Sequence, residues 1–315
     1  MQEHARLADR LKLINPSSTL AITSKAKKLK SEGKDVVSFA AGEPDFDTPD
    51  FIKQAAIEAI NAGFTKYTPT TGTPELKKLI CEKFKKDNAL EYAPSQIVVS
   101  CGAKHSIFNI LLALVNQGDE VLIPSPYWVS YPEMVNVCLG VPRFINTSAD
   151  NNFKITAQAL TQAITPRTKV LILNSPSNPT GCVYSHEELQ AIADICVKHA
   201  ILVISDEIYE KIIFDGLKHV SIASLNKKIY DLTVTVNGLS KSFSMTGWRI
   251  GYLGGPQDIV NAISNLQDHS TSNPTSISQQ AGVAALSASD EFALKIKATF
   301  QERRDVLIKR LKQIK

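Results

Sequence analysis

Lys241 is the residue whose type and position could do covalent chemistry. It follows the apolar segment 232–236, stands among small residues, and has Arg249 eight residues further along the chain. A lysine amine that is partly shielded from water and lies near another cation has a lowered pKa, which suits attack on a carbonyl carbon to form a Schiff base. The alternative interpretation is a solvated loop lysine.

Asp206 and Tyr209 form a second chemical feature. Asp206 closes a segment that begins with the four aliphatic residues 201–204. A carboxylate in such surroundings must be ion-paired or strongly hydrogen-bonded. One partner is a pyridine nitrogen, which the carboxylate keeps protonated so that the ring withdraws electrons; a helix N-cap or a structural salt bridge is the other interpretation. Tyr209, three residues on, could place its phenol beside the same ring.

Small residues also precede an expected helix at Gly102, Ala103 and Lys104. Backbone N–H groups at a helix start bind phosphate, although glycine there often serves only to turn the chain. Arg249 could add a bidentate phosphate contact or form a surface salt bridge. Trp128 could stack on a flat ring or pack in the core. Asn178, enclosed by prolines, could donate to a ring oxygen or cap a turn.

Short apolar strands alternate with helical patterns along the chain. Helical spacing is expected over 104–115, 185–198 and 291–315, with Ser185 and Glu188 forming a capping box. The expected strands are 97–99, 121–123, 170–173, 201–204, 232–236 and 250–253. This order predicts an α/β fold with a mostly parallel sheet and helices on both faces. Ligands of such sheets bind at the carboxyl ends of the strands, which the polar residues above follow.

Composition excludes several other classes. The chain has 315 residues, 43% of them hydrophobic and 21% charged, as in ordinary globular proteins. Residues 291–315 hold eight Lys or Arg and three Asp or Glu, so the remainder of the chain carries a net charge of −1. This balance argues against nucleic acid as a partner. No G-x-G-x-x-G, P-loop or H-E-x-x-H is present, so no dinucleotide, nucleoside triphosphate or metal site is expected.

The cellular compartment is predicted from the cysteines and the N-terminus. Five cysteines without a C-x-x-C spacing indicate reduced thiols. Glu3, Arg6, Asp9, Arg10 and Lys12 interrupt the first residues, so no signal peptide is expected. No apolar run is long enough to span a membrane. These features together predict a cytoplasmic protein without a membrane partner.

Together these parts describe a site for pyridoxal phosphate. The sequence resembles class I and II aminotransferases of fold type I, and specifically their bacterial aspartate aminotransferase branch, over about residues 15–315. The segments that carry the resemblance are 41–49 (AGEPDFDTP), 67–72 (YTPTTG), 125–128 (SPYW), 174–181 (NSPSNPTG), 206–209 (DEIY) and 240–251 (SKSFSMTGWRIG).

The resemblance implies a domain arrangement. Residues 1–45 would form an N-terminal arm and the first part of a small domain, and 46–290 the large pyridoxal-phosphate-binding domain. Residues 291–315 would begin a helix that links to the remainder of a small α+β domain. The expectation is that this chain ends inside that helix, so the small domain is incomplete.

The resemblance also implies roles for the cofactor residues. Lys241 would form the Schiff base and then move a proton between the substrate Cα and the cofactor. Asp206 would hold the pyridine nitrogen, Asn178 and Tyr209 the ring hydroxyl, and Trp128 would stack on the ring. The expected phosphate ligands are Gly102, Ala103 and Arg249, together with Tyr67 reaching into the site of a partner subunit. Lys104 is also expected to contact the cofactor.

That use of Tyr67 implies a homodimer with shared active sites. The resemblance further implies that Gly42, Asn178 and Trp128 contact the substrate, and that Lys104 reads a side-chain carboxylate. Ser17, Thr19 and residues 270–273 are further candidates from the other subunit. The substrates would be an amino acid, aspartate or glutamate, and a 2-oxo acid, with prephenate left open.

Two departures from the family pattern remain. A serine that often binds phosphate three residues before the Schiff-base lysine is Gly238 here, and its role is not transferred to Ser240. The arginine that clamps the substrate α-carboxylate is expected beyond Lys315. The prediction is a pyridoxal-phosphate-dependent transaminase acting through Lys241. The alternatives are a lyase or synthase of the same fold, or a catalytically impaired cofactor-binding fragment.

Overall fold

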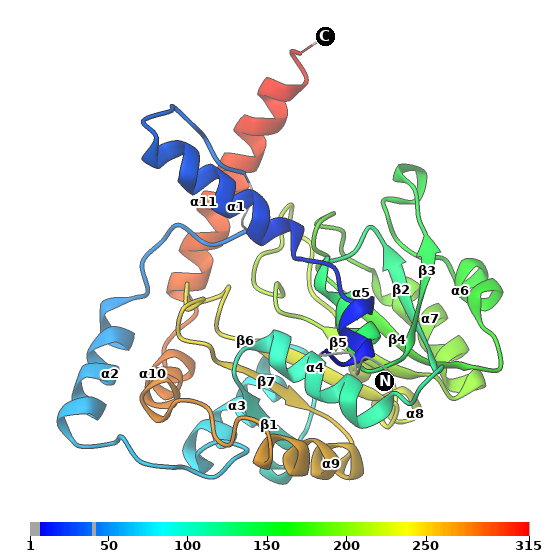
Figure 1. Cartoon of the computed structure of the whole chain (residues 1–315), viewed down its shortest axis with the longest axis horizontal. Helices are drawn as coiled ribbons and strands as arrows, with labels where there is room; N and C mark the ends of the chain where they lie inside the picture. The colour runs from blue at the N-terminus through cyan, green and yellow to red at the C-terminus, as the bar shows by residue number, and fades with distance from the viewer. Residues whose placement is uncertain (1–6, 40–41, 315) are drawn as a thin grey trace, which may run out of the picture.

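The computed structural model describes residues 7–39 and 42–314. Glu3, Arg6 and Ala41, which the sequence analysis used, lie outside these ranges, as does Lys315. One seven-stranded sheet forms the centre of the molecule, with the order β1-β7-β6-β5-β4-β2-β3 (Figure 1). Its strands are β1 Ile97–Ser100, β2 Glu120–Ser125, β3 Val141–Asn146, β4 Thr168–Asn174, β5 Leu202–Asp206, β6 Thr233–Gly238 and β7 Gly251–Gly254.

Helices cover both faces of this sheet, as the sequence predicted. The helices are α1 Ser18–Ser31, α2 Asp50–Asn61, α3 Pro74–Asn88, α4 Ala103–Leu114, α5 Ser130–Val137, α6 Ala157–Ala163, α7 His186–His199, α8 Lys227–Tyr230, α9 Gln257–Asp268, α10 Ser276–Ser287 and α11 Glu291–Leu311. Short 3₁₀ turns occur at Asp9–Leu13, Pro94–Gln96, Ala149–Asn151 and Ile222–Ser224.

The strands divide their side chains between three buried clusters. Successive side chains of a strand point to opposite faces, so Val98 and Ile97 enter different clusters. On one face the strands pack against α4, α5 and α9. On the other face, α6, α7 and α8 cover the half that contains β4 and β5, and α2, α3 and α10 cover the half that contains β1 and β7. The sheet is thus a buried layer, which explains the continuous apolar runs of its strands.

The direction of β7 differs from that of its neighbours. It pairs antiparallel with both β1 and β6, while the β2–β3, β2–β4, β4–β5 and β5–β6 pairs are parallel. The sheet is therefore mostly parallel, as predicted. The edge strand β3 was absent from the sequence prediction. Its side chains are largely exposed and it contains Pro142, so no apolar run marks it.

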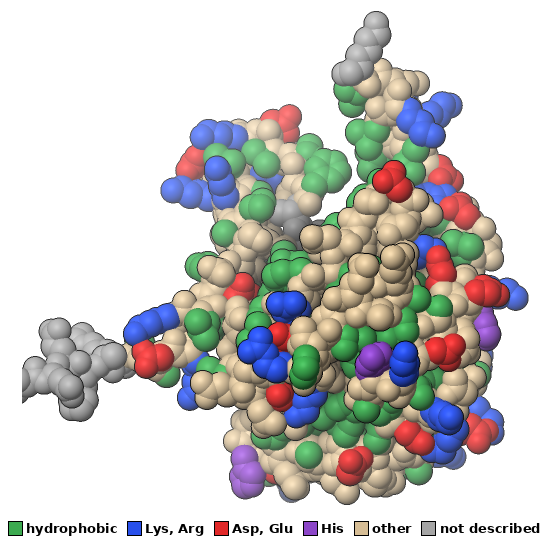
Figure 2. All heavy atoms as spheres, turned by 90° about the vertical axis from the view of Figure 1, so that its right-hand side faces the viewer, with side chains coloured by type: hydrophobic (Ala, Val, Ile, Leu, Met, Phe, Trp, Pro, Cys, Tyr) green, Lys and Arg blue, Asp and Glu red, His purple; other side chains and the backbone are tan. Residues whose placement is uncertain are grey.

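The remaining segments extend from this body. Residues before α1 lie against α5, where the backbone N–H of Asn15 donates to Glu133 at 2.9 Å. Helix α11 confirms the helix expected after residue 290, and its last turns project with hydrophobic and basic side chains exposed (Figure 2). Within the described residues, no helix combines the length and the hydrophobicity needed to cross a membrane.

The capping box of α7 gives a test of how the sequence stabilises the fold. Ser185 Oγ accepts a hydrogen bond from the N–H of Glu188 at 3.2 Å, and Glu188 accepts one from the N–H of Ser185 at 2.7 Å. Ser185→Ala should lower the free energy of unfolding by about 1 kcal/mol, because it leaves a helix N–H without its acceptor. Urea denaturation measures the loss. Ser185→Thr keeps the hydroxyl and should recover most of it; equal losses in both variants would contradict the capping role.

Candidate active site

The predicted cofactor residues other than Tyr67 stand at one edge of the sheet. Ser100, at the end of β1, and Gly238, at the end of β6, both pair with Gly251, the first residue of β7. Because β7 is antiparallel, it begins where its neighbours end. Arg249 therefore stands at the same edge as Asp206, which closes β5, and the Lys241 turn, which follows β6. The loops after β2 and β4 supply Trp128 and Asn178 to this edge.

Lys241 is a partly buried lysine that has no ion-pair partner within residues 7–39 and 42–314. Its Nζ donates to the carbonyl of Gly42 at 2.7 Å and lies 5.6 Å from the ring centroid of Tyr209. Burial lowers the pKa of Lys241; Glu43 opposes this shift and Arg249 adds to it. The amine thus has a larger neutral fraction than a solvated lysine, as a nucleophile requires.

Asp206 is a buried carboxylate that has no cationic partner among the residues that the structure describes. It is 4% exposed, and it accepts hydrogen bonds from Tyr131 Oη at 2.6 Å and from the N–H of Ile208 at 3.3 Å. Burial raises the pKa of Asp206 to about 6; these two hydrogen bonds oppose the shift and the charge of Glu207 adds to it. Among the ion pairs of the described residues, none includes Asp206, which leaves room for a cation from a bound ligand.

Asn178 and Tyr209 approach each other beside Asp206. Asn178 Nδ2 lies 3.4 Å from Tyr209 Oη. Burial raises the pKa of Tyr209 to about 12, with Asp206 adding to the shift, so the phenol stays a hydrogen-bond donor. Asn174 ties these residues together: its Oδ1 accepts from the N–H of Asn178 at 2.7 Å, and its Nδ2 donates to the carbonyl of Asp206 at 2.9 Å.

A cradle of small residues and one guanidinium forms at the start of α4. The Nη2 of Arg249 donates to the carbonyl of Cys101 at 3.2 Å, and its Nη1 donates to Thr246 at 2.8 Å. Gly102 has φ +92°, and a Cβ there would lie 2.4 Å from Arg249 Nη2. A side chain at this position would have to displace the guanidinium from the N-terminus of α4, where glycine leaves room for an anion-binding arrangement.

Trp128 and Lys104 stand next to this cradle. Lys104 Nζ lies 4.7 Å from the Trp128 ring centroid, and Trp128 makes an edge-to-face contact with Tyr131 at 5.3 Å. Partial burial lowers the pKa of Lys104, and Arg249 adds to the shift. A cation held over an aromatic face in this way can bind an anionic group of a substrate.

Tyr67 is the predicted residue that the structure leaves outside this group. It is 91% exposed, so the cofactor edge of its own chain does not enclose it. Gly42 joins the group only through its carbonyl contact with Lys241. At Gly238, where the family often has serine, a Cβ would lie 3.0 Å from Gly251 Cα, so the close β6–β7 approach accounts for the glycine.

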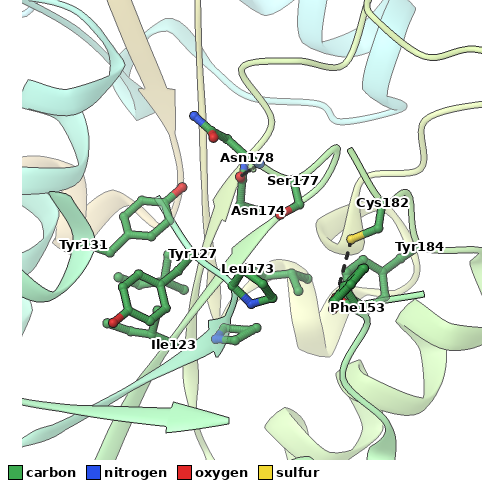
Figure 3. Close-up of a pocket in the computed structure, with 13 residues that line it drawn as sticks. Ile123, Tyr127, Tyr131, Phe153, Leu173, Asn174, Ser177, Asn178, Cys182 and Tyr184 are labelled. Carbon is green, nitrogen blue, oxygen red and sulfur yellow. Dashed lines mark hydrogen bonds between the residues drawn. The ribbon is translucent and has the colours of Figure 1, made fainter. Parts of the chain in front are cut away.

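Tyr131 and Asn174 are site residues that the sequence analysis missed (Figure 3). Tyr131 lies one helical turn after Trp128, and this spacing was a usable signal. Asn174 belongs to a segment that carried the family resemblance but was given no role. The local sequence around each residue does not indicate its contact with Asp206, because each reaches Asp206 from a different strand or helix.

Two cavities border the edge. One is lined by Asn178 and Tyr131 among other residues, and its volume of about 20 Å³ holds at most one water molecule. The other is an open cleft of about 420 Å³ between residues 43–48 and 244–248, which is large enough for a small metabolite. The second cleft gives solvent a route toward the segment that carries Gly42.

Comparisons with known proteins agree with this geometry. The model of the family described as aminotransferase class I and II matches residues 34–315. An aspartate aminotransferase of Geobacillus stearothermophilus is 52% identical over 98% of this chain and 79% of its own length.

Solved structures give the same result. The aspartate aminotransferase from Rhizobium meliloti has a TM-score of 0.95 and 45% identity, covering 99% of this chain and 78% of that one. A structure of the Thermus thermophilus aspartate aminotransferase with maleate has a TM-score of 0.94 and 42% identity. The match covers 97% of this chain and 80% of that one. The chain belongs to the class I and II aminotransferase family.

Proposed function

We propose that this aminotransferase uses pyridoxal phosphate bound at Lys241 to move an amino group between aspartate or glutamate and a 2-oxo acid. The observation that carries the cofactor assignment is Asp206, a buried carboxylate with a raised pKa and no cationic partner among the described residues. A protonated pyridine nitrogen would supply that partner. Transamination itself is the activity of the family to which the chain belongs.

The residues of the edge fit this cofactor in size and in chemistry. The Gly102 and Arg249 cradle offers backbone N–H groups and a guanidinium to a phosphate, with Ala103 and Lys104 beside it. Tyr209 and Asn178 offer donors to a ring oxygen, and Trp128 offers a flat face. When bound, pyridoxal phosphate supplies an aldehyde that condenses with amines and a ring that withdraws electrons.

The chain's own groups then divide the work. Lys241, with its lowered pKa, would hold the cofactor through its amine, and once an amino acid has taken its place that amine would carry a proton to or from the substrate Cα in each half of the reaction. Asp206 would keep a proton on the ring nitrogen. Tyr209, whose raised pKa keeps it protonated, would donate to the ring oxygen.

Lys104 supports a dicarboxylic substrate. Its ammonium lies over the Trp128 ring and has no ion pair with any described residue, so it could pair with a second carboxylate. The relatives named aspartate aminotransferase, and the neighbour solved with the four-carbon dicarboxylate maleate, support the same substrate class. Gly42 and Asn178 are proposed to contact the α-carboxylate.

A homodimer with shared sites is the proposed assembly. The exposed phenol of Tyr67 supports it, because the side chain is available to reach the phosphate of a second copy. In a mixed dimer of one Tyr67→Phe chain and one wild-type chain, pyridoxal phosphate binding should therefore weaken at the site on the wild-type chain, which receives residue 67 from the variant. The proposed domain limits are 1–45, 46–290 and 291–315, and the cytoplasm is the predicted compartment.

A spectroscopic experiment tests the function. The protein with pyridoxal phosphate should be yellow, aspartate should bleach it while releasing one equivalent of the matching 2-oxo acid, and a second 2-oxo acid should restore the colour. Glutamate and prephenate, as donor and acceptor, form the specificity arms. Release of ammonia with no need for an acceptor would instead favour a lyase, and binding without bleaching would favour an impaired fragment.

Gly102→Ala gives a prediction for the phosphate cradle. The new methyl group would crowd Arg249 and force alanine into φ +92°, so both stability and cofactor binding should fall. The expected loss is about 1–2 kcal/mol in unfolding free energy and about tenfold in pyridoxal phosphate affinity. Gly118→Ala is the matched control, since Gly118 has φ +86° but open space around it. It should lose stability alone; equal affinity losses would refute the cradle.

A further inference from the structure

A buried polar cluster lies directly behind the turn that carries Asp206. We call it the Glu207 cluster, and its members are Lys83, Asn88, Glu207, Glu210 and His219. Glu207 is 1% exposed, and each of its oxygens accepts two hydrogen bonds. The donors are Ser205 Oγ at 2.7 Å, Ser221 Oγ at 2.6 Å, Asn88 Nδ2 at 2.8 Å and His219 Nε2 at 2.8 Å.

The cluster and the cofactor residues occupy opposite sides of one strand end. Asp206 is the last residue of β5 and Glu207 follows it directly, and their side chains reach helices that cover different faces of the sheet. Asp206 meets Tyr131 of α5, whereas Glu207 meets Asn88 of α3. The N–H of Glu207 also donates to the carbonyl of Val236 on β6 at 2.9 Å. The backbone that joins the two residues is therefore anchored to β6 beside the carboxylate of Asp206.

Glu210 anchors the far end of the same turn. It pairs with Lys83 and accepts from Asn88 Nδ2 at 2.7 Å, and its N–H donates to the carbonyl of Glu207 at 3.0 Å. Asn88 thus bridges both carboxylates. Side chains of α3 and of the loop at 219–221 hold this turn on the side away from Asp206. These two segments are distant from each other in the sequence.

The charges of the cluster support an ionised Glu207. Burial opposes ionisation, but His219 and the serine hydroxyls hold the pKa of Glu207 below its usual value. Burial likewise opposes protonation of His219, yet Glu207 and Glu210 raise its pKa, against Lys83. His219 Nδ1 is buried and has no hydrogen-bond partner among the described residues, so the ring is held only through Nε2.

A metal site is the competing interpretation. Ligand atoms of Glu207, Glu210 and His219 lie within 4.8 Å of one another. However, Asn88 and Lys83 already donate into the two carboxylates, and the serines fill the rest of Glu207. The oxygens face donors, which favours a hydrogen-bonded anchor.

We propose that Glu207, held by His219 and Asn88, is a positioning residue that fixes the carboxylate of Asp206 against a protonated ring nitrogen. The inference rests on the proposed cofactor. If the proposal is correct, the cluster affects cofactor affinity only through the contact between Asp206 and the ring nitrogen. A residue that merely stabilised the fold would affect the binding of any ligand at this site.

The test compares two ligands by equilibrium dialysis: pyridoxal phosphate and 1-deazapyridoxal phosphate, in which CH replaces the ring nitrogen. Glu207→Gln and His219→Leu should raise the Kd for pyridoxal phosphate by about tenfold. They should change the Kd for the deaza ligand by less than about twofold, because Asp206 has no proton to share with it. His219→Gln keeps an N–H donor near the position of Nε2 and should recover most of the affinity.

Glu120→Gln is the matched control. Glu120 is fully buried and accepts hydrogen bonds from Thr165 and Arg167, but it begins β2 at the opposite edge of the sheet. It should destabilise the apoprotein without changing the ratio of the two Kd values. If Glu207→Gln does not fold, Ser221→Ala removes one hydrogen-bond donor to Glu207 instead, and the Kd values for the two ligands are compared in the same way.

Equal weakening of both ligands in the Glu207 and His219 variants would overturn the proposal, as would unchanged affinities for both. Failure of the wild-type protein to bind pyridoxal phosphate would overturn the proposed function itself, and with it this inference.

Discussion

Replacement of Lys241 by Ala is expected to abolish the Schiff-base absorbance and to lower amino transfer by about 10²–10⁴-fold. The variant loses both the nucleophile and the group that moves the proton. Pyridoxal phosphate should still bind, because the Gly102 and Arg249 cradle and Asp206 are unchanged. Borohydride reduction followed by peptide mass spectrometry should label Lys241 in the wild-type protein and no lysine in the variant.

Lys77 provides the matched control for this experiment. It is also half-buried with a pKa lowered by burial, and it donates to Thr71 Oγ1 at 3.1 Å. Lys77→Ala should retain the absorbance and the activity, since a lowered pKa alone does not make a lysine catalytic. Labelling of Lys77, or a yellow Lys241→Ala protein, would remove Lys241 from its proposed role.

Asp206→Asn is expected to lower the activity and to raise the free energy of unfolding of the apoprotein. Asparagine keeps the shape of the side chain but cannot hold a proton on the ring nitrogen as an anion. Removing one partner of a buried ion pair costs about 3–5 kcal/mol, so kcat/KM should fall by about 10²–10⁴-fold. Steady-state kinetics with aspartate and a 2-oxo acid measure this loss.

The stability effect follows from the raised pKa of Asp206. Its folded value of about 6 exceeds its ordinary value of 3.8. Between these pH values the folded apoprotein binds more protons than the unfolded chain, so the free energy of unfolding falls as pH rises and the loss is complete above about 6. Asparagine avoids it. Apo Asp206→Asn should therefore be more stable than the wild type by about 3 kcal/mol at pH 7.5, and by less at pH 5.

Glu120→Gln should behave in the opposite way. Burial opposes ionisation of Glu120, but Thr165, Arg143 and Arg167 hold its pKa below the usual value. Its charge thus stabilises the fold, and the variant should lose stability at pH 7.5. Urea denaturation of both apoproteins at the two pH values gives the comparison. A less stable apo Asp206→Asn at pH 7.5 would show that Asp206 carries no unfavourable charge.

The predicted strands and helices came from patterns that local physics explains. Six of the strands are buried runs, and a run of aliphatic residues marks a strand covered on both faces. Ser185 and Glu188 marked the start of α7 because both halves of a capping box lie within four residues. The exposed strand β3 carried no such pattern and was missed.

The Glu207 cluster and the Tyr131 contact could not be predicted in this way. Asn88 and Glu207 are 119 positions apart, and Tyr131 and Asp206 are 75 apart. A single sequence records residue types along the chain, whereas these hydrogen bonds depend on how α3 and α5 pack across the sheet. Glu207 therefore looked like an ordinary charged neighbour of Asp206.

The sequence by itself determined the chemical residue types and the strand ends at which Lys241, Asp206 and Asn178 stand, because these are properties of short segments. Only the tertiary structure decided that Arg249 reaches the same edge, since this depends on β7 running antiparallel between β1 and β6. It also decided that Asp206 is buried with no cationic partner in the described part of the chain, because burial and partners are set by packing from several elements at once.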